Sequence, residues 1–380
     1  MIRYYYAGKE IDKLYFSNIS RPEITVTATD PSMNKSIETV RLVVDSPPRF
    51  YGVHDQYVFK GSSVRDLDPV FACDEVDGGI SSRITSNLSS LNLNNIGDYK
   101  IKYTVTDSYG LEARAESTVH VVTSRKRVEE HKDDCILSNG DLSYAAEEGF
   151  FSSSPLAKPD RNRVIEDCGV SLVNLFVDKE DSTSSGSAFI YKVDPPYIYM
   201  VSVYHVTSEL ERQPVTIIFY DGTRKRVAIR SIRMSAGNEA ALFRIPIKIV
   251  PYHVLVRLRE VAWESDIYDR VKDGTPLIEY CKNWRGGDLS KLVKDVEVIS
   301  FTLSPIQRQY VDDDSYYATT RKSVSGMSGT AVFDYRGVLA GICSKTMYPL
   351  ESEEAEFRDG CDFVLMVDKL DELLARKDEL

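Results

Sequence analysis

The chain has little basic charge relative to its acidic charge, no long apolar run and no closely spaced cysteine pair. Its 47 Lys and Arg residues are outnumbered by 58 Asp and Glu residues, which gives a net charge of −11 at pH 7. Nucleic acid selects for a basic surface, so this balance argues against a nucleic-acid partner. A membrane-spanning helix needs about 20 consecutive apolar residues, whereas the most apolar run, residues 245–256, contains two prolines and a lysine. We therefore predict neither a nucleic-acid partner nor a membrane span.

The cysteines follow no metal or redox pattern. None of the six forms a C-x-x-C pair, which argues against a zinc site and against a thioredoxin-like motif. Their even number fits one or two disulfides in an oxidising compartment, and it fits buried free thiols equally well. We assign no cofactor and no metal, and leave the disulfide pairing open. Residues 1–6 contain no apolar segment of the kind that a signal peptide carries.

The length of 380 residues, with 42% hydrophobic and 28% charged residues, predicts two or three globular domains. An internal repeat marks the first of them: the segment around Asp30 recurs around Asp107. Both copies predict a strand, an Asp-containing turn and a second strand. In the second copy, alternation puts one set of apolar side chains on a single face of a strand, namely Tyr99, Ile101, Tyr103 and Val105.

A unit made only of short strands, from about residue 47 to 122, predicts a small antiparallel β-sandwich. It resembles the bacterial Ig-like repeats, relatives of the HYR modules of exported proteins, at Gly61 and in residues 72–80, 97–99 and 103–107. Residues 1–45 match only the last strands of such a unit, so we expect the chain to start inside an upstream repeat. We divide this half into a partial Ig-like repeat (1–45) and an Ig-like β-sandwich (46–123). The resemblance implies a surface or protein partner for these modules.

The aspartates at the predicted turns have two interpretations. Carboxylates gathered at loops can bind calcium, and aspartate is favoured in turns without any ion. Calcium binding is therefore left open for Asp30, Asp74, Asp77 and Asp107.

The second half of the chain begins with a change of composition. Residues 124–165 are acidic, Ser-rich and Pro-containing, with little periodicity, and predict a linker. From residue 166 short strands resume, with a hairpin signal at Asp221-Gly222. The chain ends in a helical pattern over residues 367–374. A β-barrel domain with a terminal helix is therefore predicted for residues 166–380.

A glycine-flanked serine is the first candidate for chemistry. In Gly326-Met-Ser328-Gly329, glycines allow the backbone to approach a substrate carbonyl and to turn its amides toward it. His205 ends a predicted strand, and Glu239 precedes an apolar strand. The order His, acid, Ser along the chain is that of chymotrypsin-like proteases.

Several segments around these residues resemble the trypsin-like serine proteases of the Deg (high-temperature-requirement) type. They are residues 186–189, 215–245, 337–342 and 361–368. The resemblance spans about residues 168–375 and implies a double β-barrel of the chymotrypsin type. The fold class is thus mainly β throughout, with Ig-like sandwich modules before the barrels.

The resemblance implies a role for each site residue. Ser328 is the nucleophile and His205 the general base. Glu239 stands where the family carries Asp and orients the imidazole. The amides of Gly326 and Ser328 form the oxyanion hole.

Lys322 and Ser344 are assigned to substrate binding. Lys322 lies six positions before the nucleophile, at the floor of the S1 pocket in this fold, and there it predicts cleavage after Glu or Asp. The other interpretation is that Lys322 points outward from a loop.

Three departures from the family pattern support a rival interpretation. They are Tyr204 before the histidine, Glu239 in place of Asp, and Thr330 where Gly is commoner. We therefore predict a serine endopeptidase positioned by Ig-like modules and acting on a protein or peptide substrate. The alternative is a non-catalytic barrel in an adhesive or binding protein. The modules favour an extracytoplasmic location, although residues 377–380 read Lys-Asp-Glu-Leu, the retrieval signal of the ER lumen.

Overall fold

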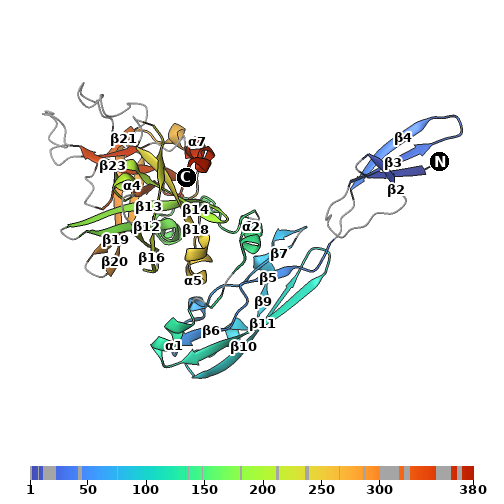
Figure 1. Ribbon diagram of the computed structural model, residues 1–380, viewed down its shortest axis with the longest axis horizontal. Helices are drawn as coiled ribbons and strands as arrows, with labels where there is room; N and C mark the ends of the chain where they lie inside the picture. Colours follow the sequence, from blue (N-terminus) through green and yellow to red (C-terminus); the bar gives the residue numbers. More distant parts are fainter. Residues whose placement is uncertain are drawn as a thin grey trace. The chain divides into compact units, whose positions relative to one another are not determined.

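Figure 1 shows the computed structural model of the chain. It describes residues 2–6, 8–11, 23–41, 45–74, 76–132, 134–135, 137–147, 149–179, 182–210, 214–235, 239–264, 266–285, 288–299, 316–320, 326–347, 361–365 and 370–380. The chain divides into two compact units, residues 1–137 and 138–380, each described by itself below. Within the described ranges, no helix has both the length and the apolar character needed to cross a membrane.

The first unit starts with a four-stranded antiparallel sheet in the order β2-β1-β3-β4. Its strands are β1 (Ile2–Tyr6), β2 (Lys9–Ile11), β3 (Glu23–Thr29) and β4 (Lys35–Arg41). Two further sheets follow in the same unit, β5-β7-β8 and β6-β11-β10-β9. Their strands are β5 (Arg49–Tyr51), β6 (Gln56–Phe59), β7 (Phe71–Asp74), β8 (Gly78–Gly79), β9 (Thr85–Ser86), β10 (Gly97–Thr106) and β11 (Glu112–Val122).

The alternation predicted for β10 is the pattern observed. Ile101, Tyr103 and Val105 are buried, while Lys100 and Lys102 are exposed. Ile101 and Tyr103 pack in a core with residues of β6 and β11, and Val105 packs against Ala72 of β7. One face of β10 thereby contributes to the core that both sheets of this Ig-like β-sandwich share.

The internal repeat is a repeat of turn geometry. Asp30 directly follows β3 and accepts a hydrogen bond from the amide of Asn34 at 2.9 Å. Asp107 directly follows β10 and accepts one from the amide of Leu111, also four residues further on, at 2.8 Å. The third residue after each aspartate has a positive φ, 68° at Met33 and 85° at Gly110. The aspartate therefore holds the same five-residue turn closed in both copies.

The second unit contains two strand systems. A seven-stranded antiparallel sheet has the order β16-β15-β12-β13-β14-β18-β17. Its strands are β12 (Leu172–Lys179), β13 (Ser182–Asp194), β14 (Tyr197–Val203), β15 (Val215–Ile218), β16 (Arg224–Val227), β17 (Ser231–Arg233) and β18 (Ala240–Pro246). The predicted hairpin at Asp221-Gly222 joins β15 to β16.

The second strand system is a closed barrel, β19-β20-β21-β24-β23-β22. Its strands are β19 (Pro276–Arg285), β20 (Asp288–Ile299), β21 (Tyr316–Thr319), β22 (Ala331–Phe333), β23 (Leu339–Met347) and β24 (Cys361–Leu365). One core cluster of the barrel is apolar, with Leu277, Val332 and Ala340 fully buried. The predicted terminal helix is α7 (Leu370–Ala375), which buries Leu370 and Leu373.

Residues 124–165 differ from the predicted linker, because most of them are folded. Helix α1 (Arg125–Glu130) sets the Arg125 guanidinium over the Phe59 ring of the first unit. Helices α2 (Asn139–Glu147) and α3 (Arg161–Cys168) belong to the second unit. Between them the buried Phe151 accepts a hydrogen bond from the amide of Glu260 at 2.7 Å. Contacts with distant residues order this segment, and these leave no periodic pattern in its own sequence.

The alternating pattern of residues 252–258 predicts a strand in which His253 has a structural role. His253 lies instead in the short helix α5 (Tyr252–Leu255). Its Nε2 is 3.3 Å from Oδ2 of Asp221. Burial acts to raise the pKa of Asp221, but hydrogen bonds from His253 and Thr223 outweigh it and bring the pKa to about 2. His253 therefore stabilises the β15–β16 hairpin, in line with the structural role expected for it.

The cysteines and the C-terminus bear on the compartment. Five cysteines take part in no disulfide, namely Cys73, Cys135, Cys168, Cys281 and Cys343, so the disulfide alternative does not apply to them. In the last four residues, Lys377 pairs with Asp194, and the Leu380 carbonyl accepts a hydrogen bond from Arg244 at 2.6 Å. These contacts hold the Lys-Asp-Glu-Leu segment against the second unit, and a location in the ER lumen receives no support.

Candidate active site

His205 and Glu239 meet at the edge of the seven-stranded sheet. His205 lies in helix α4 (Tyr204–Leu210), which directly follows β14, and Glu239 directly precedes β18. Strands β14 and β18 are paired with Val203 opposite Ala240. This register brings the start of α4 next to the residue before β18, and His205 Nδ1 is 2.8 Å from Glu239 Oε2. The histidine side chain is 40% exposed and the glutamate 13%, so the imidazole is open to a substrate while the acid behind it is shielded.

Two further hydrogen bonds fix Glu239. The amide of Tyr204 donates to the Glu239 carbonyl at 2.6 Å. The hydroxyl of Ser344, a buried residue of β23 in the closed barrel, donates to Glu239 Oε2 at 3.3 Å. The carboxylate therefore receives donors from both strand systems. Ser344, assigned from the sequence to substrate binding, directs its side chain at the acid of the site.

Ser328 lies on a tight loop that leads into β22. Gly326 and Gly329 on either side of it have φ of 94° and 87°, a region that other residues rarely adopt. A Cβ on Gly329 would lie 2.0 Å from the Ser187 carbonyl oxygen and 2.3 Å from the Ser202 hydroxyl. The loop thus presses against β13 and β14 so closely that only glycine fits there.

Ser187 of β13 holds this loop, a role that sequence reasoning missed. Its amide donates to the Ser328 carbonyl at 2.8 Å, and its hydroxyl donates to the Gly326 carbonyl at 2.9 Å. Its own carbonyl accepts from the Ser202 hydroxyl at 2.6 Å. The only sequence signal was its place in the Gly186-Ser-Ala-Phe segment that resembles the protease strand before the histidine.

Gly186 shows that the serine loop and the histidine helix lie around one point. A Cβ on Gly186 would be 2.5 Å from the Val206 side chain and 3.4 Å from the Ser328 carbonyl oxygen. Val206 is the residue after His205 and is buried against this strand. Strand β13 therefore separates the serine loop from the histidine helix α4 by little more than its own backbone.

The amides assigned to the oxyanion hole make no hydrogen bond to another group in the described part of the chain. Their neighbours do: the Gly329 amide donates to the Cys343 carbonyl at 2.9 Å, and the Thr330 amide donates to the Met327 carbonyl at 2.8 Å. The loop thus uses its later amides for its own structure and leaves those of Gly326 and Ser328 for another acceptor.

The three departures noted in the sequence have structural counterparts. The Tyr204 ring is covered by the guanidinium of Arg233 in β17, 5.1 Å from the ring centre. Thr330 is buried behind the loop. Glu239, with its extra methylene, is within hydrogen-bond distance of the histidine. Lys322 falls outside the described residues.

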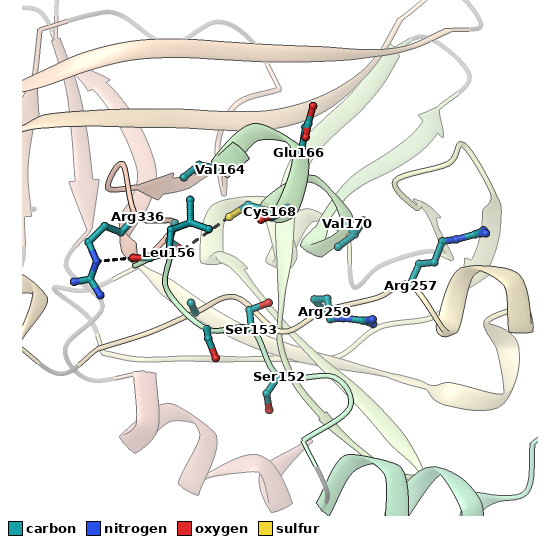
Figure 2. Close-up of a pocket in the computed structure, with 14 residues that line it drawn as sticks. Ser152, Ser153, Leu156, Val164, Glu166, Cys168, Val170, Arg257, Arg259 and Arg336 are labelled. Atoms are coloured by element: carbon teal, nitrogen blue, oxygen red, sulfur yellow. Dashed lines mark hydrogen bonds between the residues drawn. The ribbon is translucent and has the colours of Figure 1, made fainter. Parts of the chain in front are cut away.

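A separate pocket of about 420 Å³ lies elsewhere in the second unit (Figure 2). None of His205, Glu239 and Ser328 lines it. The Cys168 thiol lines it, and burial, with the charges of nearby Asp167 and Asp334, raises the pKa of this thiol to about 12. The thiol is therefore protonated near neutral pH, and the pocket is not the centre of the candidate chemistry.

Comparison with known proteins gives two results for the two halves. Residues 49–121 match the family described as "Bacterial surface protein, Ig-like domain". No curated protein shows significant sequence similarity to the chain.

Similar solved structures include the HtrA-type protease AlgW with a tripeptide, at 18% identity and a TM-score of 0.42. That likeness covers 57% of this chain and 63% of the AlgW chain, so this protein spans less than two thirds of that structure. A serine endoprotease from Yersinia pestis is 14% identical over 58% of this chain and 67% of its own, with a TM-score of 0.41. The Rv3671c protease of M. tuberculosis, in an inactive form, is 16% identical over 59% of this chain and 98% of its own, with a TM-score of 0.39.

Proposed function

We propose that the protein is a serine endopeptidase whose triad is His205, Glu239 and Ser328, positioned on a surface or partner by its Ig-like modules. The observation that carries the proposal is the 2.8 Å contact of His205 Nδ1 with Glu239 Oε2, beside a serine on a glycine loop. The match to a bacterial surface family supports a location outside the cell or on its surface. The substrate is a protein or a peptide.

The proposed chemistry follows from the hydrogen bonds of the site. Glu239 accepts a hydrogen bond from the protonated Nδ1 of His205. The other ring nitrogen, Nε2, is then unprotonated and acts as the base. The Ser328 hydroxyl gives its proton to Nε2 as its oxygen attacks the scissile carbonyl carbon. The same proton then passes to the leaving amine, and water releases the acyl group by the reverse steps. Glu239 stabilises the imidazolium that forms in each half of the reaction.

The amides of Gly326 and Ser328 would donate to the oxyanion of the tetrahedral intermediate, each worth a few kcal/mol of transition-state stabilisation. Ser187 keeps them in place, because it holds the two carbonyls of the same loop. Donors fixed before the reaction need no reorganisation when the charge develops.

The test is labelling of the full chain with a fluorophosphonate probe, together with cleavage of a peptide library. Nucleophile and base act as one unit, so Ser328→Ala and His205→Ala should each abolish both signals, and the double variant should be no worse. His253→Gln, which changes the histidine of the β15–β16 hairpin, should retain labelling.

Labelling that persists in Ser328→Ala, or clear turnover in either single variant, would contradict the assignment. A folded wild-type chain that neither labels nor cleaves would favour the alternative, a non-catalytic barrel in an adhesive or binding protein.

A further inference from the structure

Three carboxylates converge in the Ig-like β-sandwich, far along the chain from one another. Asp45 lies in the segment before β5, Asp74 ends β7, and Asp107 directly follows β10. Each offers an oxygen that lies within 4.8 Å of the other two. Asp74 is 2% exposed and Asp107 7%. Oxygens bind calcium at about 2.3–2.6 Å, so atoms separated by no more than about twice that distance can share one ion.

The hydrogen bonds of the turns involve only one carboxylate oxygen of each buried aspartate. Asp74 Oδ1 accepts hydrogen bonds from the amides of Val76 and Asp77 at 2.8 and 2.9 Å. Asp107 Oδ1 accepts from the amides of Tyr109 and Leu111 at 2.9 and 2.8 Å. These bonds are the ordinary reason for aspartate in a turn. They leave Oδ2 of both residues without a role.

Oδ2 of Asp74 and Oδ2 of Asp107 are buried and accept no hydrogen bond from any described residue. A buried carboxylate oxygen with no donor is costly. Three carboxylates gathered at one point also repel one another. A bound cation would remove both costs, and one carboxylate oxygen of each of the three aspartates lies within 4.8 Å of the other two. We propose that Asp45, Asp74 and Asp107 bind a calcium ion.

The other two turn aspartates, Asp30 and Asp77, have no carboxylate oxygen left without a donor. Asp30 accepts hydrogen bonds from Asn34 on both of its oxygens, at 2.9 and 2.8 Å. Asp77 accepts from Ser108 on both oxygens and pairs with Arg83 at 2.5 Å. Their oxygens are occupied by protein donors, so neither is a ligand. Asp77 instead ties the loop after Asp74 to the loop after Asp107, and this brings the two ligand loops together.

The ligand chemistry selects calcium among the common cations. All three ligands are hard oxygens, which excludes the ions that prefer thiolate or imidazole. Magnesium is usually bound through one or two carboxylates and keeps several waters, whereas calcium accepts cages with more carboxylates. Calcium sites of extracellular modules have a Kd of about 0.1–1 mM. Because Asp45 precedes β5 by four residues, the ion would fasten the entry of the chain to two loops of the sandwich.

The experiment uses the full chain, freed of divalent ions with EDTA and dialysed. Titration with CaCl2 in a calorimeter should give one ion per chain with a Kd of about 1 mM or tighter. In 10 mM CaCl2 the sandwich should unfold roughly 5–10 °C higher than in EDTA. Hydrogen exchange should slow in peptides that cover residues 71–77 and 105–111.

Asp74→Asn and Asp107→Asn retain an Oδ1 acceptor for the turn but remove the charge and one ligand oxygen. Each should weaken calcium binding at least about tenfold. In EDTA each should unfold at the same temperature as the wild type or higher, because carboxylate repulsion is relieved. A purely structural role of either aspartate predicts a lower temperature instead. Asp30→Asn is the matched turn variant and should leave the calcium response unchanged.

Three results would overturn the proposal. The first is no heat and no shift of unfolding up to 10 mM CaCl2. The second is an unchanged calcium response in both Asn variants. The third is an equal effect of MgCl2 at equal concentration, which would exclude the assignment to calcium.

Discussion

At the scale of single residues, Glu239 decides how the histidine of the site is held. Its Oε2 accepts from His205 Nδ1 and from the Ser344 hydroxyl, and its backbone accepts from Tyr204. The residue lies just before β18, and the Tyr204 amide holds its backbone. The carboxylate is more deeply buried than the imidazole, so water competes weakly for it.

The first prediction at this scale concerns the charge of Glu239. An amide in its place presents an N–H as well as an acceptor, and can hold His205 in the wrong tautomer. Glu239→Gln should therefore lower the rate of fluorophosphonate labelling by about 10³–10⁴-fold. Glu239→Asp, which keeps the charge, should lose no more than about 100-fold. Glu372→Gln, on the exposed side of α7, serves as the control.

Equal labelling rates for Glu239→Gln and the wild type would show that a different acid, or none, orients His205. Near-ultraviolet circular dichroism of both variants would establish that the fold is retained.

At the scale of elements, β13 organises the candidate site although it carries none of the three side chains of the proposed triad. Ser187 holds the serine loop, and Gly186 lies against Val206 of the histidine helix. The strand belongs to the seven-stranded sheet, while the serine loop leads into the closed barrel. The spacing of the site therefore depends on contacts between strand and loop that tolerate no added atoms.

This close packing predicts different outcomes for two glycines with nearly the same φ, 87° at Gly329 and 91° at Gly222. Gly222→Ala has nothing within 4 Å of the new Cβ, so only the backbone conformation opposes it, at about 1 kcal/mol. Gly329→Ala places the Cβ 2.0 Å from a backbone oxygen of Ser187. It should cost at least about 2 kcal/mol more in the free energy of unfolding, and it should abolish labelling.

Chemical denaturation of the two variants, with labelling in parallel, checks this difference. Similar losses of stability in Gly329→Ala and Gly222→Ala would mean that the loop can move away from β13, and the close approach would then not be essential to the site.

At the scale of the whole molecule, the second unit begins earlier in the chain than the sequence indicates. Residues from 138 onward belong to it. Arg161 makes a bidentate pair with Asp295 of the closed barrel, and the amide of Leu156 donates to the Arg336 carbonyl at 2.8 Å. Phe151 is 1% exposed. The segment before α3 is therefore part of the fold that supports the site.

Fragments of the chain test this boundary. Residues 138–380 should fold alone and label with the fluorophosphonate probe at the rate of the full chain. Residues 153–380 lack α2 and Phe151, and should be less stable by at least about 3 kcal/mol, the usual cost of losing one buried phenylalanine. Phe151→Ala in the longer fragment is the matched comparison. Equal stability of both fragments would show that residues 138–152 contribute nothing to this unit.

The sequence alone determined what depends on neighbouring residues. The alternation in β10, the Asp turns of the repeat and the Asp221-Gly222 hairpin were predicted because strand and turn preferences act over a few residues. The order of His205, Glu239 and Ser328 pointed to a fold whose register sets two of them 2.8 Å apart.

Only the tertiary structure decided what depends on contacts between distant segments. The linker prediction failed for residues 138–165 because their order comes from Arg336, Asp295 and Glu260, far along the chain. Ser187 is an ordinary strand residue until the serine loop is folded against it. Asp45 joins Asp74 and Asp107 only through the fold of the sandwich. The sequence suggested calcium for four turn aspartates, and the hydrogen bonds of the folded domain leave an unpartnered buried oxygen on just two of these four.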